Sequence, residues 1–288
     1  MKLLRFGPAG HEKPGLLDAH GNLRDASSVV DDYSPAFFAQ GGIDTLLRTD
    51  PASLPVVPGT PRLGSCIAQP GNFIAIGLNY VQHAIETNAP IPEEPIIFNK
   101  APSCISGPDD PVILPRGSVK CDWEVEIALV IGKRALYVPE ERALDHVAGY
   151  CVCNDVSERE MQLEHGGQWV KGKMFPSFGP LGPWLVTPDE LGDVQNLALW
   201  LELNGKRIQN SSTSDMIFRL ATIVSYVSRH VLLQPGDVIT TGTPPGVGLG
   251  MKPERYLKPG DVMELGVEGL GTQKQTVIAF DDSSLARR

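Results

Sequence analysis

The chain has 288 residues, with 25 Lys and Arg against 34 Asp and Glu, and its net charge of −9 argues against sequence-independent nucleic-acid binding, which needs clustered cations. It contains 30 Gly and 25 Pro, and 42% of its residues are apolar, which is typical of a folded, turn-rich protein. No apolar run approaches the ~20 residues that would cross a bilayer, so we expect no membrane partner.

The cysteines and the N-terminus predict a cytoplasmic protein. Five cysteines, an odd number spread over a long chain, do not make a disulfide framework, and residues 1–7 lack the apolar stretch of a signal peptide. Cys151 and Cys153 have no second pair nearby, so we expect small buried residues of a strand and not zinc ligands.

Two units of unequal size are predicted in chain order. Residues 1–53 contain short strands and turns, and the Pro/Gly-rich residues 54–61 are typical of a linker. Clear strand patterns begin at about Pro70. We therefore predict a small N-terminal domain with its linker over 1–69 and a larger domain over 70–288.

Strands dominate the second unit. We expect them at 73–78, 95–98, 123–131, 150–156 and 197–203, the last ending in an Asn-Gly turn. Pro-Gly-Asp-Val occurs at 235–238 and at 259–262, and each copy predicts a tight turn that leads into an apolar run. Helices are expected at 139–147, from a Ser157-x-x-Glu160 capping box to Gly166, and after Ser214. Because the helices mostly do not alternate with the strands, this pattern favours a β-rich α+β fold.

Three carboxylates form the first candidate site. In an unbroken strand, Asp122, Glu124 and Glu126 would share one face, which alone could be the solvated face of an amphipathic strand. Glutamate is depleted in strands, however, and neighbouring carboxylates repel each other unless a cation lies between them. Asp155 ends another strand, where it could also cap a helix. Glu124, Glu126 and Asp155 together would form an all-oxygen site suited to Mg²⁺ or Mn²⁺.

A second candidate site is the pair His83 and Glu86. At i and i+3 they share a face of any helical turn, where a carboxylate can orient an imidazole as a general base, although an exposed helix face would look the same. Residues 88–95 are too rich in proline for regular structure and could form a lid. Lys173 lies in a glycine-rich loop and could equally be solvated. The glycine-rich stretch 241–250 precedes no helix, which excludes a dinucleotide site.

Several motifs in a fixed order are similar to one known family. They are residues 76–80 with His83 and Glu86, then 122–126, 154–157, 172–173, 178–183 and 241–248. From about residue 73 to 280, the chain resembles the fumarylacetoacetate hydrolase family. The resemblance implies a mixed β-sandwich roll as the catalytic domain, a homodimer, and a divalent metal, Mg²⁺ or Mn²⁺.

The resemblance also assigns roles to residues of this chain. It implies metal ligands at Glu124, Glu126 and Asp155, a water-activating pair at His83 and Glu86, and substrate-site residues at Arg159, Gln162, Lys173 and Thr243. The chain departs from many relatives at 174–178, where Pro176 replaces an acidic residue and lacks an amide donor. We therefore expect a different loop around Lys173.

The resemblance implies a hydrolase that cleaves a C–C bond of a small anionic 2,4-diketo acid and releases pyruvate. Residues 166–169 and 182–187 are similar to a sugar-acid branch, which acts on 2,4-diketo-3-deoxy-L-rhamnonate or -L-fuconate in carbohydrate catabolism and gives pyruvate and lactate. Two alternatives are an oxaloacetate decarboxylase or a ureidoglycolate lyase-type enzyme on the same scaffold, and a carboxylate-binding protein without catalysis.

Overall fold

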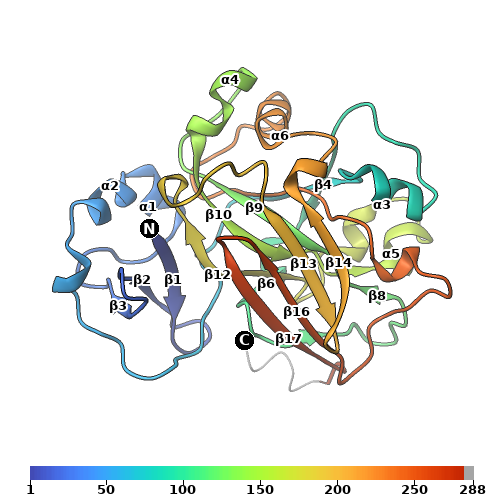
Figure 1. The fold of residues 1–288 in the computed structure, drawn as a ribbon, viewed down its shortest axis with the longest axis horizontal. Coiled ribbons are helices and arrows are strands. Elements are labelled where there is room, and N and C mark those ends of the chain that lie inside the picture. Colours follow the sequence, from blue (N-terminus) through green and yellow to red (C-terminus); the bar gives the residue numbers. More distant parts are fainter. Residues whose placement is uncertain (282–288) are drawn as a thin grey trace.

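The protein is built mainly from β-strands, as Figure 1 shows for the computed structural model, which describes residues 1–281. The predicted β-rich α+β class is confirmed, and the sheets contain both parallel and antiparallel pairs. The helices among residues 1–281 are all too short or too polar to span a bilayer.

The larger sheet has ten strands and carries most of the candidate site. Nine follow the spatial order β3-β2-β1-β12-β10-β9-β15-β4-β5, and β6 pairs with β12. Their bounds are β1 Lys2–Phe6, β2 Lys13–Leu17, β3 Leu23–Asp25, β4 Phe73–Gly77, β5 Ile96–Lys100, β6 Ile105–Ser106, β9 Val125–Ile131, β10 Val147–Asn154, β12 Gly179–Val186 and β15 Val238–Thr240.

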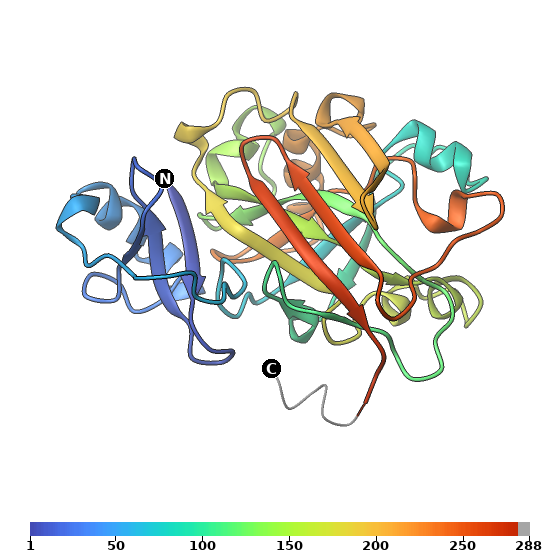
Figure 2. The same cartoon turned by 60° about the horizontal axis from the view of Figure 1, so that its bottom comes forward.

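A five-stranded sheet lies across one face of the larger one, so that the two form a sandwich (Figure 2). Its order is β14-β13-β16-β17-β7, with β7 Val112–Ile113, β13 Ala198–Leu203, β14 Lys206–Ser212, β16 Val262–Val267 and β17 Gly271–Ile278. Buried glutamines join the layers, because Gln273 Nε2 donates to Val152 O at 2.8 Å and Gln209 Oε1 accepts from Val125 N at 3.1 Å. A separate pair consists of β8 Cys121–Asp122 and β11 Ser157–Glu158.

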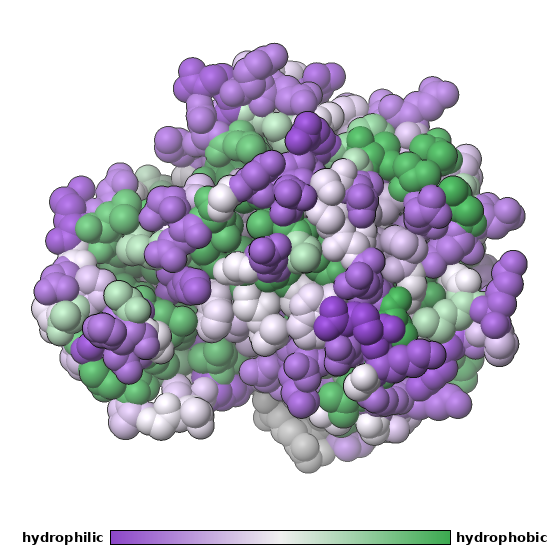
Figure 3. Space-filling model, viewed as in Figure 1, coloured by the Kyte–Doolittle hydropathy of each residue, from purple (hydrophilic) through white to green (hydrophobic). Residues whose placement is uncertain are grey.

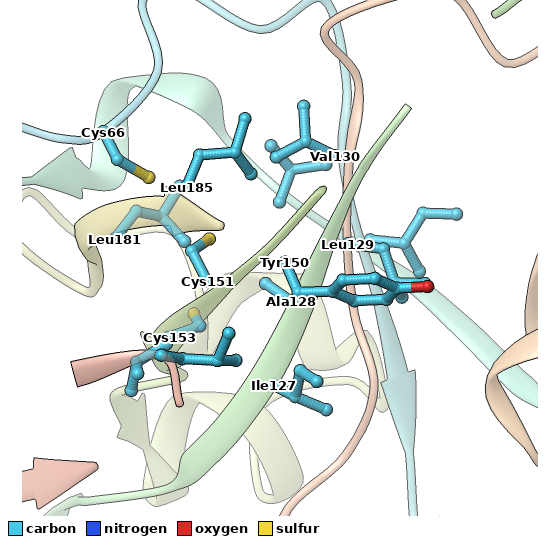
Figure 4. Close-up of a cluster of buried hydrophobic side chains, with 14 of the residues drawn as sticks. Cys66, Ile127, Ala128, Leu129, Val130, Tyr150, Cys151, Cys153, Leu181 and Leu185 are labelled. Atoms are coloured by element: carbon cyan, nitrogen blue, oxygen red, sulfur yellow. The ribbon is translucent and has the colours of Figure 1, made fainter. Parts of the chain in front are cut away.

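The main core lies around β9, β10 and β12. Figure 4 shows Cys151 and Cys153 of β10 among apolar side chains such as Leu181 and Ile127. Both cysteines are fully buried and free, as predicted. This packing fixes β9 and β10 side by side, and the ends of these two strands carry the predicted carboxylates.

The N-terminal residues extend the larger sheet. β1 pairs antiparallel with β12, with Lys2 opposite Val186. Two helices, α1 Pro35–Ala39 and α2 Gly42–Leu47, also occur here, although the sequence analysis predicted strands and turns only. In α1, Ser34 caps the helix and Pro35 follows at its first position, and this pair of residues is a helix-start signal in the sequence. The division at residue 69 stays a prediction.

Four further α-helices occur among residues 1–281, and the helix expected over 157–166 is shorter than predicted. They are α3 Val81–Glu86, α4 Glu140–Ala143, α5 Arg159–Leu163 and α6 Leu220–Val227. The capping-box prediction is wrong: Ser157 belongs to β11, and the cap of α5 is Glu158, whose side chain accepts from Met161 N. Strand pairing with β8 keeps the chain extended through Ser157 and moves the helix cap by one residue, from Ser157 to Glu158.

Candidate active site

Antiparallel pairing brings the three predicted carboxylates together. Val125 of β9 lies opposite Asn154 of β10, and Asp155 N donates to Glu124 O at 2.9 Å. Glu124 and Asp155 therefore leave the two strands side by side. Oxygen atoms of Glu124, Glu126 and Asp155 lie within 4.8 Å of one another, and all three residues are buried.

Two buried lysines neutralise part of this cluster. Lys173 Nζ lies 2.8 Å from Glu124 Oε2 and 2.7 Å from Asp155 Oδ2. Lys100 Nζ bonds the other oxygen of Asp155 and the carbonyl oxygen of Lys173. Asp155 therefore serves this cluster and not a helix cap. Lys173 contacts the carboxylate cluster although the neighbouring Pro176 differs from the family pattern. Lys100 is a further site residue that was not among the predicted ones.

Asp122 does not share the carboxylate site. β8 and β9 are separate strands, so the expected face common to Asp122, Glu124 and Glu126 is broken. All three are buried, so the solvated-face alternative is wrong. Asp122 instead accepts from Arg159 Nε at 2.8 Å and from the backbone nitrogens of Gly248 and Leu249.

Arg159 joins this group to Glu124. Its Nη1 lies 2.7 Å from Glu124 Oε1 and donates to Gln162 Oε1 at 3.0 Å. Its Nη2 is buried and has no partner among residues 1–281. A buried donor without a partner costs about 1–3 kcal/mol, which a bound acceptor would relieve. Arg159 therefore offers one free cationic end to a ligand.

The carboxylates differ in their tendency to ionise. Burial by itself would raise the pKa of Glu124, but the adjacent Lys173 and Arg159 outweigh it and hold that pKa well below its usual range. Burial raises the pKa of Glu126, and the negative charges of Asp155 and Glu124 raise it further. One carboxyl oxygen of Glu126 accepts from Gly242 N at 2.8 Å and from Thr240 Oγ1. Glu126 therefore tends to keep its proton, because the lysines and the arginine already pair with the other carboxylates of the site.

His83 and Glu86 form the predicted pair on α3. His83 Nδ1 lies 2.9 Å from Glu86 Oε1, and Glu86 Oε2 accepts from Gly246 N at 2.8 Å. An ionised Glu86 only accepts, so with this partner His83 Nδ1 is the donor, and in the neutral ring Nε2 has the lone pair. His83 is buried, so the exposed-face alternative is wrong for it. Val81 and Ile85 of α3 are exposed, and the hydrophobic area at the upper right of Figure 3 lies where Figure 1 places this helix.

These groups surround one cavity of about 120 Å³. Glu86 and Asp155 do not line the cavity themselves but bind the lining residues His83 and Lys173, respectively. The predicted residues in the lining are His83, Glu124, Glu126, Arg159, Gln162, Lys173 and Thr243. The Thr243 hydroxyl donates to Val125 O and accepts from Gln209 Nε2. Its proton is therefore already engaged. The remaining wall is largely apolar and includes Ile76, Leu78, Phe98, Leu163, Trp169 and Leu249.

The carboxylate cluster fits a divalent cation. Its donors are all oxygens, which Mg²⁺ and Mn²⁺ prefer, and they converge closely enough to share one ion. Lys173 already places a positive charge between Glu124 and Asp155, which indicates that the geometry favours a cation there.

The comparisons with known proteins agree with this site. Residues 72–278 match the model of the fumarylacetoacetate hydrolase C-terminal family. A Burkholderia lata protein that carries a provisional hydrolase name is 57% identical over 96% of this chain and 98% of its own length. The chain therefore belongs to the fumarylacetoacetate hydrolase family, and the prediction of a hydrolase is confirmed.

Solved structures support the same assignment. The fumarylacetoacetate hydrolase of Exiguobacterium antarcticum has a TM-score of 0.87 and 36% identity over 97% of this chain and all of its own. The maleylpyruvate hydrolase of Sphingobium sp. SYK-6, in complex with manganese(II) and pyruvate, has a TM-score of 0.79 and 26% identity over 98% of this chain and all of its own.

Proposed function

We propose that this protein hydrolyses 2,4-diketo acids between C3 and C4 and releases pyruvate, with a divalent metal held by Glu124, Glu126 and Asp155. The observation that supports this most is that a cavity lined by carboxylates also contains His83, oriented by Glu86. A decarboxylase or lyase needs no activated water, and a protein that only binds carboxylates needs no base. Hydrolysis uses both parts of the site.

The metal would supply Lewis-acid chemistry by polarising oxygens of the substrate. Arg159 would bind the substrate carboxylate through its unpartnered Nη2. Lys173 would lie beside the charge that develops on the pyruvate part. Glu86 would keep the His83 ring in position and stabilise the imidazolium that forms.

The proton balance follows from the orientation of His83. Nε2 would take a proton from water as the oxygen attacks C4 of the substrate. The C3–C4 bond then breaks, its electron pair stays with C3 as an enolate of pyruvate, and the acyl carbon becomes a carboxylic acid. A proton returned to C3 completes pyruvate, so one water is consumed for each bond broken.

Among diketo acids, we propose 2,4-diketo-3-deoxy-L-rhamnonate or -L-fuconate, with lactate as the second product, in carbohydrate catabolism. Support comes from residues 166–169, because Trp169 lies in the cavity wall. We propose Mg²⁺ or Mn²⁺ as the metal and a homodimer as the assembly. A cytoplasmic location agrees with five buried cysteines that form no disulfide.

A panel of substrates tests the reaction. The protein would be assayed with 2,4-diketo acids, oxaloacetate and ureidoglycolate in the presence of Mg²⁺ or Mn²⁺, with pyruvate and CO₂ both measured. We expect pyruvate without CO₂ from a diketo acid. Turnover of oxaloacetate or ureidoglycolate alone would overturn the proposal.

A further inference from the structure

The cations that line the cavity among residues 1–281 are already engaged with its own carboxylates. Lys173 contacts Glu124 and Asp155, and Arg159 contacts Asp122 and Glu124. His83 is held by Glu86. Of the charged donors that line the cavity among residues 1–281, Arg159 Nη2 is the one buried atom without a hydrogen-bond partner. The site therefore has capacity for one carboxylate of the substrate.

The neutral polar groups of the lining offer little to a second carboxylate. Thr87 Oγ1 donates to His83 O at 2.8 Å, and Thr243 Oγ1 donates to Val125 O at 3.0 Å. Gln162 is uncharged and accepts from Arg159 through its Oε1. A single neutral amide offsets only part of the free energy that a carboxylate loses when it leaves water.

The rest of the wall is apolar and closely packed. Phe98 and Trp169 pack edge to face with their ring centres 5.7 Å apart, and Lys173 Nζ lies 5.2 Å from the centre of the Phe98 ring. Gly77 lets Trp169 approach, because a Cβ there would lie 2.3 Å from the indole ring. The wall therefore begins at the charged end and continues away from it as aromatic and aliphatic surface.

We infer that this site selects substrates whose acyl group is uncharged, so that the substrates are monocarboxylic 2,4-diketo acids. The inference rests on the proposed function. The carboxylate and the 2-keto group occupy the charged end, and the acyl group then lies against Leu78, Phe98 and Trp169. A terminal carboxylate on that group would lose its hydration without gaining a cation. The lactoyl group proposed above is uncharged and satisfies this requirement.

A matched pair of substrates tests the inference. 2,4-Dioxoheptanoate and 2,4-dioxoheptanedioate have the same seven-carbon chain and differ in a terminal methyl or carboxylate. Assays at roughly 0.5 M salt, where the Debye length is about 4 Å, remove repulsion of the dianion by the net negative protein. We expect kcat/KM to be at least about 100-fold higher for the heptanoate.

A ratio of 10 or less, or a preference for the dioate, would overturn the inference and leave the hydrolase intact. Release of pyruvate from neither substrate, nor from any other diketo acid tested, would instead overturn the proposed function. These two failures are therefore distinguishable.

Two arginine variants locate the acyl group. Leu163→Arg adds a cation to the apolar wall, and Leu136→Arg is the matched control, because each leucine is 46% exposed and Leu136 lies outside the lining. Leu163→Arg should shift the ratio at least about 10-fold towards the dioate, and Leu136→Arg should not change it. Equal ratios in the two variants would contradict the placement of the acyl group against this wall.

Discussion

The pair His83 and Glu86 offers the sharpest test of water activation. Loss of a general base lowers a rate by about 10² to 10⁴, which is roughly 2.7 to 5.5 kcal/mol. We expect His83→Ala to lower kcat by that factor. Its affinity for Mn²⁺, measured by calorimetry, should stay unchanged, because the three carboxylates remain in place.

The effect of Glu86→Gln on kcat can be predicted from the two groups that donate hydrogen bonds to the Glu86 carboxylate. Both His83 Nδ1 and Gly246 N donate to this carboxylate. A glutamine has one acceptor oxygen, so its NH₂ group must face one of these two donors. A donor that is left without an acceptor costs about 1–3 kcal/mol, and we therefore expect kcat to fall by roughly 5- to 150-fold.

The double variant decides whether the two residues act as one unit. If Glu86 works only through His83, His83→Ala/Glu86→Gln should have the kcat of His83→Ala alone within about 2-fold. Full activity of His83→Ala would refute water activation by His83. Two independent, multiplicative losses would refute the positioning role of Glu86.

Three further changes probe the metal site, the cavity wall and the fold. Glu124→Gln should weaken Mn²⁺ binding by about 100-fold. At a Mn²⁺ concentration that stabilises the unchanged protein by ~2.7 kcal/mol, the variant should gain only about 0.4 kcal/mol, with a correspondingly small rise in its melting temperature. Equal shifts would show that Glu124 is not a metal ligand. Gly77→Ala should displace Trp169 and raise KM more than it lowers kcat, whereas an unchanged KM and unchanged tryptophan fluorescence would contradict the close contact. Asn79→Ala removes three hydrogen bonds that the buried Asn79 side chain makes with Phe218 and Thr241 and should cost about 3 kcal/mol in urea unfolding. A loss below 1 kcal/mol would be inconsistent with this network.

The sequence predicted those parts of the site that depend on short spacing. His83 and Glu86 meet because they lie one helical turn apart, and the resemblance assigned Glu124, Glu126 and Asp155 as one group. The strand at 197–203 ends as expected in an Asn-Gly turn, in which both residues have positive φ.

The remainder depends on strand pairing, which spacing does not reveal. Asp122 contacts Arg159 because β8 pairs with β11, so that residues 121–122 do not continue strand β9. Lys100 enters the site only because β5 pairs with β4. A lysine at the end of an apolar run was an available signal, since a buried lysine requires an anionic partner.

The most direct test of the central claim is hydrolysis in ¹⁸O-labelled water. The protein would be supplied with Mn²⁺ and the diketo acid that it turns over fastest, and the products would be quantified by mass spectrometry. The proposed reaction predicts one pyruvate and one carboxylic acid for each substrate consumed, with one ¹⁸O atom from the attacking water in the new carboxyl group. Release of CO₂, or an isomerised product with its carbon chain intact, would contradict it.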